Sequence, residues 1–233
     1  MSGIVELIAV DCVTKSPWNG IEAEECRKEI QLEADIYRTV GHHQRFVKFF
    51  GYEPTDGSIT LEYMRNGTVR DYLQEHNNEI SFAQRFQWTL QATEGLQILH
   101  SAGIIHCDFS PRNLLLDANL ELKVTDFGGC SIRGSRTLAM GSVRYYLPRS
   151  TRLPPSTGAD IFALGSTVYE IMTGSIPYKD FSSDQVKQLY ELSQFPDLSG
   201  VQLSGVIRSC WLLQVESAKQ VCNILRSTEP SIA

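Results

Sequence analysis

The segment from His106 to Gly128, HCDFSPRNLLLDANLELKVTDFG, constrains this chain of 233 residues more than any other stretch. Two short apolar or β-prone runs, 114–117 and 120–125, flank a turn-forming Asp-Ala-Asn sequence, and this pattern predicts a β-hairpin. Because the two ends of a hairpin lie together, we expect Asn113 and Asp126, thirteen positions apart, to meet at one end of the structure.

The polar residues around this predicted hairpin have the chemistry that metal-assisted phosphoryl transfer requires. A carboxylate must accept the proton of the attacking hydroxyl, and Mg²⁺ must neutralise the charge on the phosphate oxygens. Asp108 is the candidate proton acceptor. Asn113 and Asp126 offer the hard oxygen ligands that Mg²⁺ prefers. The segment therefore predicts a phosphoryl-transfer site with bound Mg²⁺.

These residues resemble two motifs of the eukaryotic protein kinase superfamily. His106-Cys107-Asp108 with Asn113 is similar to the catalytic loop H-R-D-x-x-x-x-N, and Asp126-Phe127-Gly128 matches D-F-G. The resemblance implies one domain with an α+β, bilobal fold. Residues 1–63 would be a truncated small lobe of strands and helix C, and residues 64–233 a mainly helical large lobe. The implied activity is transfer of the ATP γ-phosphate to a Ser, Thr or Tyr hydroxyl of a protein.

Further site residues follow from the resemblance. Glu33, within the helical pattern Glu22–Val40, matches the acid of helix C that holds the ATP-contacting lysine. Glu62 and Met64 match the hinge whose backbone groups hydrogen-bond the adenine ring, and Arg112 matches an arginine that tyrosine kinases place as a phosphate contact. The implied cofactors are ATP and Mg²⁺.

Apolar periodicity predicts the elements around these motifs. Residues 46–52 and 58–63 have the composition of strands, and residues 81–103 have the spacing of a helix with one buried face. Asp160, in ADIFALGSTVYEIMTG, resembles the aspartate of the family's helix F, which would brace the backbone of the catalytic loop.

The nucleotide side of the predicted site departs from the family pattern. The G-x-G-x-x-G loop is absent, since only Ser2-Gly3 precedes the first strand-like run, so we expect the roof over the nucleotide to be missing. Ile8–Asp11 aligns with V-A-I-K, which places a carboxylate at the lysine position. Lys15, eighteen residues before Glu33, is the nearest substitute, but four residues of strand displace a side chain by about 13 Å.

The large lobe also departs from the pattern. Cys107 replaces the arginine that receives an activation-loop phosphate, so an active form should not need that phosphorylation. Arg149 and Ala218 replace both partners of the family's buried ion pair, and a paired loss can be nearly neutral. Six hydroxyl residues follow the D-F-G motif: Ser131, Ser135, Thr137, Ser142, Tyr145 and Tyr146.

Three interpretations stay open at this stage. The first is an active protein kinase. The second is a non-catalytic pseudokinase that acts as a protein-binding or allosteric module, in which Asp108, Asn113 and Asp126 are structural loop residues. The third is a sequence that lacks the first strands of a longer kinase. The missing roof and lysine favour the second interpretation, whereas the three polar residues favour the first.

Composition limits the partners. A net charge of −6 and a pI of about 5.4 argue against nucleic acid or an anionic membrane, so a protein substrate, a regulatory protein or ATP fits better. The six cysteines form no C-x-x-C pair, and neither a signal peptide nor a membrane-spanning apolar run is found. We therefore expect an intracellular, cytoplasmic protein.

Overall fold

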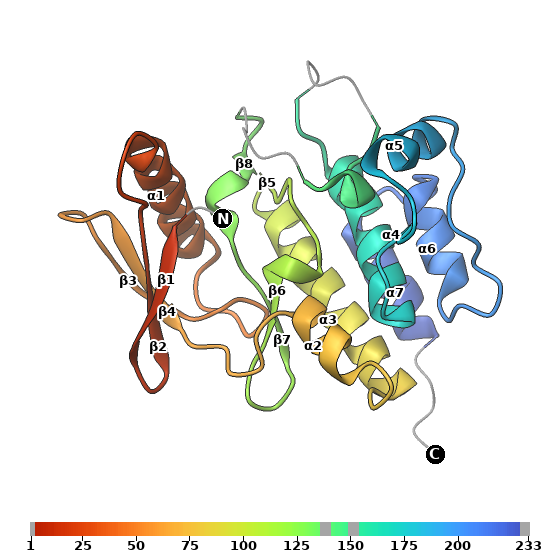
Figure 1. Cartoon of the computed structure of the whole chain (residues 1–233), viewed down its shortest axis with the longest axis horizontal. Coiled ribbons are helices and arrows are strands. Elements are labelled where there is room, and N and C mark those ends of the chain that lie inside the picture. The colour runs from red at the N-terminus through yellow and green to blue at the C-terminus, as the bar shows by residue number, and fades with distance from the viewer. Residues whose placement is uncertain (1–2, 136–140, 149–153, 229–233) are drawn as a thin grey trace.

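An antiparallel sheet and one long helix form the N-terminal part of the chain, which the computed structural model describes over residues 3–135, 141–148 and 154–228 (Figure 1). The strands lie in the order β1-β2-β4-β3. Their bounds are β1 (Ile4–Ala9), β2 (Cys12–Ser16), β3 (Phe49–Glu53) and β4 (Ser58–Glu62). Valine, isoleucine, threonine or aromatic residues, which favour extended backbone, occur in each of these segments.

Helix α1 (Ala23–Val40) packs one face against this sheet. Its buried residues recur every three or four positions, as a helix with one apolar face requires: Cys26, Ile30, Glu33, Ala34, Ile36 and Tyr37. Glu33 is an acid within this apolar stripe. A buried carboxylate is costly unless it is paired, so its position points to a nearby cation.

The rest of the described chain is mainly helical. The helices are α2 (Val69–His76), α3 (Phe82–Ser101), α4 (Thr157–Thr173), α5 (Ser183–Glu191), α6 (Ser204–Trp211) and α7 (Ala218–Ser227). Helices α2, α3, α4, α5 and α7 each begin after a serine or threonine whose hydroxyl accepts a backbone N–H in the first turn. No helix in these three ranges combines the length and the apolarity needed to cross a bilayer.

Two short pairs of antiparallel strands lie between the sheet and the helices (Figure 1). One joins β6 (Leu114–Leu116) to β7 (Leu122–Val124), and the other joins β5 (Ile104–Ile105) to β8 (Ser131–Ile132). The first pair confirms the predicted hairpin. The second ties the start of the catalytic loop to the segment that follows D-F-G, so both motifs are held at one place.

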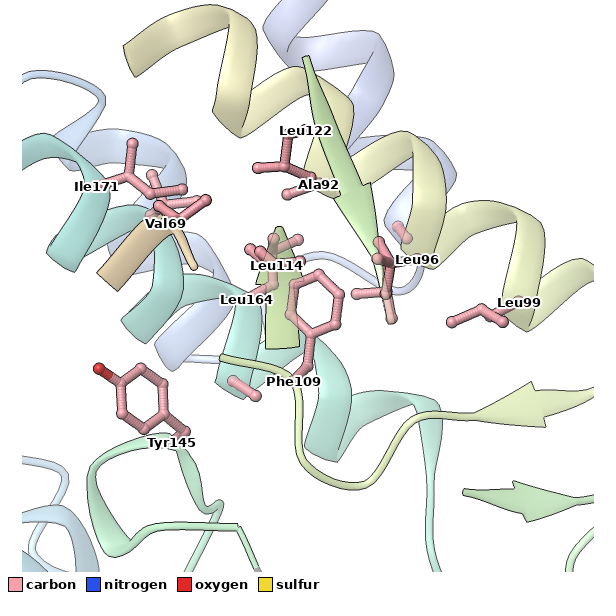
Figure 2. Close-up of a cluster of buried hydrophobic side chains, with 14 of the residues drawn as sticks. Val69, Ala92, Leu96, Leu99, Phe109, Leu114, Leu122, Tyr145, Leu164 and Ile171 are labelled. Carbon is pink, nitrogen blue, oxygen red and sulfur yellow. The ribbon is translucent and has the colours of Figure 1, made fainter. Parts of the chain in front are cut away.

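Phe109 anchors the catalytic loop in the apolar core. Its side chain is fully buried, and Figure 2 shows it pointing into a cluster with Leu96 of α3, Leu114 of β6 and Leu164 of α4. Helices α4 and α6 pack closely, because a Cβ added at Gly165 of α4 would lie 2.9 Å from Cβ of Cys210 in α6. This core fixes the loop that carries Asp108.

The other sequence predictions of elements hold with small shifts. The predicted helix over 81–103 is α3, and the strands over 46–52 and 58–63 are β3 and β4. β3 begins three residues late because Phe46 instead forms a bridge with Val124 of β7. The α+β, bilobal kinase-like fold is thus the one observed.

Candidate functional site

Lys15, near the end of the inner strand β2, joins two carboxylates. Its Nζ lies 2.6 Å from Oε2 of Glu33 in α1 and 2.7 Å from Oδ1 of Asp126. The Lys15 side chain is only 8% exposed and that of Glu33 is 1% exposed, so water screens this pair weakly. Burial disfavours the charged amine, but the two carboxylates together outweigh it and raise the pKa of Lys15. Lys15 therefore stays protonated.

This geometry corrects the sequence alignment of the lysine position. Ile8–Asp11 spans the end of β1 and its turn into β2, where Asp11 is exposed and pairs with Nη2 of Arg65 at 2.6 Å. The strand that faces α1 is instead Cys12–Ser16, which carries Lys15. The apolar residues Ile8 to Val10 suggested the wrong strand for the lysine. The spacing of eighteen residues between Lys15 and Glu33 was the signal that agrees with their contact.

One strand, β1, precedes the lysine strand, although the alignment with V-A-I-K took this first strand to carry the lysine position. Val5 is the direct partner of Lys15, and Leu7 is the direct partner of Val13. Direct cross-strand partners lie on the same face of a sheet, so Val5, Leu7 and Val13 share the face of Lys15. Val5 is 56% exposed and Leu7 is 60% exposed. β1 therefore adds an exposed apolar surface beside the lysine.

Asp108 and Asn113 lie at the two ends of the catalytic loop and contact each other. The side-chain amide of Asn113 donates to the carbonyl of Asp108 at 2.8 Å and to its Oδ2 at 3.2 Å. Since the amide nitrogen faces Asp108, the oxygen at the other end of the same amide is the atom suited to a cation. The backbone carbonyl of Asn113 accepts the N–H of Thr125, next to Asp126, as the hairpin predicts.

Asp160 of α4 braces this loop, as the sequence predicted. Its carboxylate accepts the backbone N–H of His106 at 2.7 Å and that of Cys107 at 2.9 Å. Cys107 adopts a φ of 68°, a conformation that a non-glycine residue reaches only when its surroundings hold it. His106 is fully buried and its Nε2 contacts the carbonyl of Thr125 at 3.1 Å, so it is a positioning residue of the loop.

The D-F-G motif is held by its phenylalanine. Phe127 is fully buried, and its ring meets those of Tyr37 in α1 and Phe46 edge-on, at centroid distances of 4.8 and 5.7 Å. The preceding Asp126 has left-handed backbone angles, φ 62° and ψ 65°. The buried ring thereby places the Asp126 carboxylate beside Lys15. Tyr37 belongs to no motif, and its only signal in the sequence was its position on the apolar stripe of α1.

The carboxylate of Asp108 has the properties of a proton acceptor. Burial raises its pKa, and the nearby charge of Asp126 acts in the same direction, while His106, Asn113 and Arg112 oppose the rise. A raised pKa makes the ionised carboxylate a stronger base. Arg112 is exposed in the turn Pro111–Asn113, so its guanidinium is accessible from solvent.

The two predicted hinge residues use part of their backbone within the fold, since the N–H of Glu62 donates to the carbonyl of Lys48 at 2.9 Å. The carboxylate of Glu62 forms an ion pair with Nζ of Lys123 at 2.7 Å and accepts a hydrogen bond from the N–H of Lys48. Met64 is buried, and its carbonyl accepts the N–H of Gly67 at 3.1 Å. The structure thus brings Lys15, Glu33 and Asp126 into direct contact and pairs Asp108 with Asn113. Nucleotide and metal binding by these residues stays a prediction.

The donors at the site suit a divalent cation. The carboxylates of Glu33, Asp108 and Asp126 carry three negative charges against one positive charge on Lys15, and with Asn113 they provide hard oxygen atoms. Within residues 3–135, 141–148 and 154–228, no three His, Cys, Asp or Glu side chains are arranged to hold a metal ion by themselves. Mg²⁺ usually keeps several water ligands and is held by one or two carboxylates together with substrate phosphates.

Comparison with known proteins places these features in context. The family model for protein tyrosine and serine/threonine kinases matches residues 7–227. The chain is 32% identical over 161 residues to serine/threonine-protein kinase STY46 of Arabidopsis thaliana, covering 66% of this chain and 28% of that protein. It is 29% identical over 220 residues to mitogen-activated protein kinase kinase kinase 1 of the same organism, covering 88% and 35%. The chain thus spans about a third of the length of these curated relatives.

Proposed function

Since this chain belongs to the eukaryotic protein kinase superfamily, we propose that it binds ATP with Mg²⁺ and transfers the γ-phosphate to a Ser, Thr or Tyr hydroxyl of a protein. The observation that carries this proposal is the contact of Lys15 with both Glu33 and Asp126. It brings β2, α1 and the D-F-G motif to one point. A chain that had lost its lysine would not make this contact.

Lys15 and the apolar face of the sheet would hold the nucleotide. The ammonium of Lys15 would contact the phosphates, and the exposed aliphatic side chains of Val5 and Leu7 would cover the adenine ring together with Val13. Backbone groups of Glu62 and Met64 would supply hydrogen bonds to the ring, because the Glu62 carboxylate is already paired with Lys123. Small-molecule sites commonly combine apolar walls with a few such polar groups.

Asp126 and Asn113 would hold the metal ion through the carboxylate and the amide oxygen. When bound, Mg²⁺ neutralises the charge of the phosphate oxygens during transfer.

Asp108 would accept the proton of the substrate hydroxyl. Its raised pKa supports this role, and the hydrogen bond from Asn113 to Oδ2 orients the carboxylate. Arg112, exposed on the next turn of the loop, would contribute positive charge near the transferred group. Phe109 and Asp160 keep the loop in place, so the base keeps its orientation during turnover.

A pseudokinase that serves as a binding module is the second candidate function. The observation in its favour is that no G-x-G-x-x-G pattern occurs in the sequence, although this loop covers the ATP phosphates in the family. In that case the network of Lys15, Glu33 and Asp126 would serve only to hold α1 against the D-F-G motif.

Thermal unfolding with ATP and Mg²⁺ separates the two candidates. At ligand a hundredfold above its dissociation constant, binding adds about 2.7 kcal/mol, which is a rise in Tm of roughly 5–11 °C at about 2–4 °C per kcal/mol. The rise should disappear in Asp126→Asn and with a chelator, and stay in the surface control Asp56→Asn. Radiolabel transfer to casein, lost in Asp108→Asn, would then establish phosphotransfer. A folded chain with no rise in Tm would leave the binding module as the better account.

A further inference from the structure

Arg70, Glu170 and Tyr145 form a buried network among three separate elements. Arg70 is in α2, Glu170 is in α4, and Tyr145 ends the short turn Val143–Tyr145 in the segment after D-F-G. Arg70 donates from Nε to Oε1 of Glu170 at 2.8 Å and from Nη2 to Oε2 at 2.9 Å. Nη2 also donates to the hydroxyl oxygen of Tyr145 at 2.6 Å, and that hydroxyl donates to Oε2 of Glu170.

The geometry of this network makes it stronger than a surface ion pair. The contact between Arg70 and Glu170 is bidentate, and their side chains are only 9% and 4% exposed. The guanidinium also lies 5.4 Å from the ring centroid of Tyr145. Burial, and next the charge of Glu170, raise the pKa of Tyr145 far above its usual value, so the hydroxyl stays a donor.

The neighbouring residue fixes the same segment from a second side. Arg144 donates from Nε to the carbonyl of Pro177 at 2.9 Å, and from Nη2 to the carbonyls of Tyr178 at 3.2 Å and Phe181 at 2.6 Å. In return, the hydroxyl of Tyr190 in α5 donates to the carbonyl of Arg144 at 3.3 Å. Arg144 and Tyr145 thus tie this segment to α2, α4, α5 and the loop of residues 177–181.

The segment held in this way borders the candidate base. A Cβ built on Gly141 would lie 3.2 Å from Oδ1 of Asp108, so the backbone at 141 passes directly beside that carboxylate. The position of residues 141–146 therefore decides what can approach Asp108. Cys107 provides no cation to bind a phosphate on this segment, so another group must hold it.

We propose that Arg70 and Glu170 are positioning residues that hold residues 141–146 beside Asp108 without any phosphate on the segment, and so preform the surface that receives the protein substrate. The substrate part rests on the proposed function. The positions of the family's own buried ion pair hold Arg149, which lies outside the described residues, and Ala218, which is buried at the start of α7, so neither position carries that pair's residue type. Tyr145 is then a structural anchor and not a phosphate acceptor.

The test replaces both charges so that the fold survives. Exchanging a buried ion pair for apolar residues of similar volume is often neutral for stability, so the double variant Arg70→Met with Glu170→Met should unfold near the wild-type Tm. Amide hydrogen exchange over residues 141–147 should become about tenfold faster, which corresponds to about 1.4 kcal/mol, while exchange in α4 stays unchanged. The matched control is Arg45→Met with Glu94→Met, a partly buried pair that does not contact this segment.

Steady-state kinetics provide the second measurement. In the double variant, KM for casein should rise several-fold while KM for ATP keeps its wild-type value, because only the protein-binding segment has been released. Phosphatase treatment of the wild-type chain should change neither the exchange over 141–147 nor KM for casein.

Two results would overturn the proposal: unchanged exchange over 141–147 in a folded double variant, or faster exchange in the wild-type chain after phosphatase treatment. If the wild-type chain transfers no phosphate, the proposed function fails, and the exchange measurement still decides the positioning role.

Discussion

Substitution of Lys15 by methionine should destabilise the chain strongly, because it leaves a buried carboxylate without its cation. Glu33 is fully buried and its Oε2 is paired with Nζ of Lys15, so the variant leaves a negative charge without its cation. Breaking a buried ion pair by removing one partner costs about 3–5 kcal/mol. The Asp126 side chain is 31% exposed, and water can replace its contact with Lys15, so we assign the cost to Glu33.

The expected loss is measurable by thermal unfolding. For a domain of this size, each kcal/mol shifts Tm by about 2–4 °C, so Lys15→Met should lower Tm by about 6–20 °C at neutral pH. In the variant, burial without a cation raises the pKa of Glu33 above its unfolded value. The deficit should therefore be full at neutral pH and shrink as pH falls toward the unfolded carboxyl pKa of about 4.3.

A second substitution and a surface control test the cause. Lys15→Met combined with Glu33→Leu removes both charges and should recover most of the lost Tm. Lys28→Met, on the exposed face of α1 where the lysine is 61% exposed, should change Tm by no more than about 1–2 °C. Equal Tm values for the single and double variants would refute the argument that the unpaired Glu33 causes the loss.

Three more substitutions follow from the geometry. Asp108→Asn should raise Tm at neutral pH, since it removes a carboxylate whose pKa is raised by burial. The gain in Tm should vanish below the ordinary carboxyl pKa of about 3.9. A gain that is independent of pH would contradict this explanation. Gly165→Ala should cost about 1–3 kcal/mol because its Cβ would press on Cys210, whereas Gly205→Ala, with open space around it, should be neutral or slightly stabilising by thermal unfolding. Phe109→Ala should cost about 3–5 kcal/mol in denaturant unfolding, and a loss below about 1 kcal/mol would show that the core cluster does not hold the loop.

The local pattern of the sequence was enough to predict the catalytic loop, the hairpin and D-F-G. Turn residues between two apolar runs specify β6 and β7, and the hairpin then brings Asn113 and Asp126 to one end without help from distant segments. The bracing of the loop by Asp160 also followed from a motif, because the motif carries both the acid and its helix.

The position of the lysine could not be predicted in the same way. The apolar residues from Ile8 to Val10 have the composition of a strand, as does the segment Cys12–Ser16. Periodicity alone does not specify the register between β1 and β2. The alignment with V-A-I-K therefore placed Asp11 at the lysine position and left Lys15 as the nearest substitute. Only the packing of β2 between β1 and β4, with Lys15 facing α1, decides which strand supplies the cation.

The sequence by itself determined the family of folds and the chemical groups of the site, because those depend on residue types at short spacings. Tertiary structure decided which groups meet. Arg70 and Glu170 are one hundred positions apart, and Lys15 and Asp126 are separated by one hundred and eleven, so no local pattern could pair them. These contacts form because burying the apolar residues of β2, α1, α2, α4 and the D-F-G motif brings the charged residues beside them within hydrogen-bonding distance. A buried charge must find a partner there.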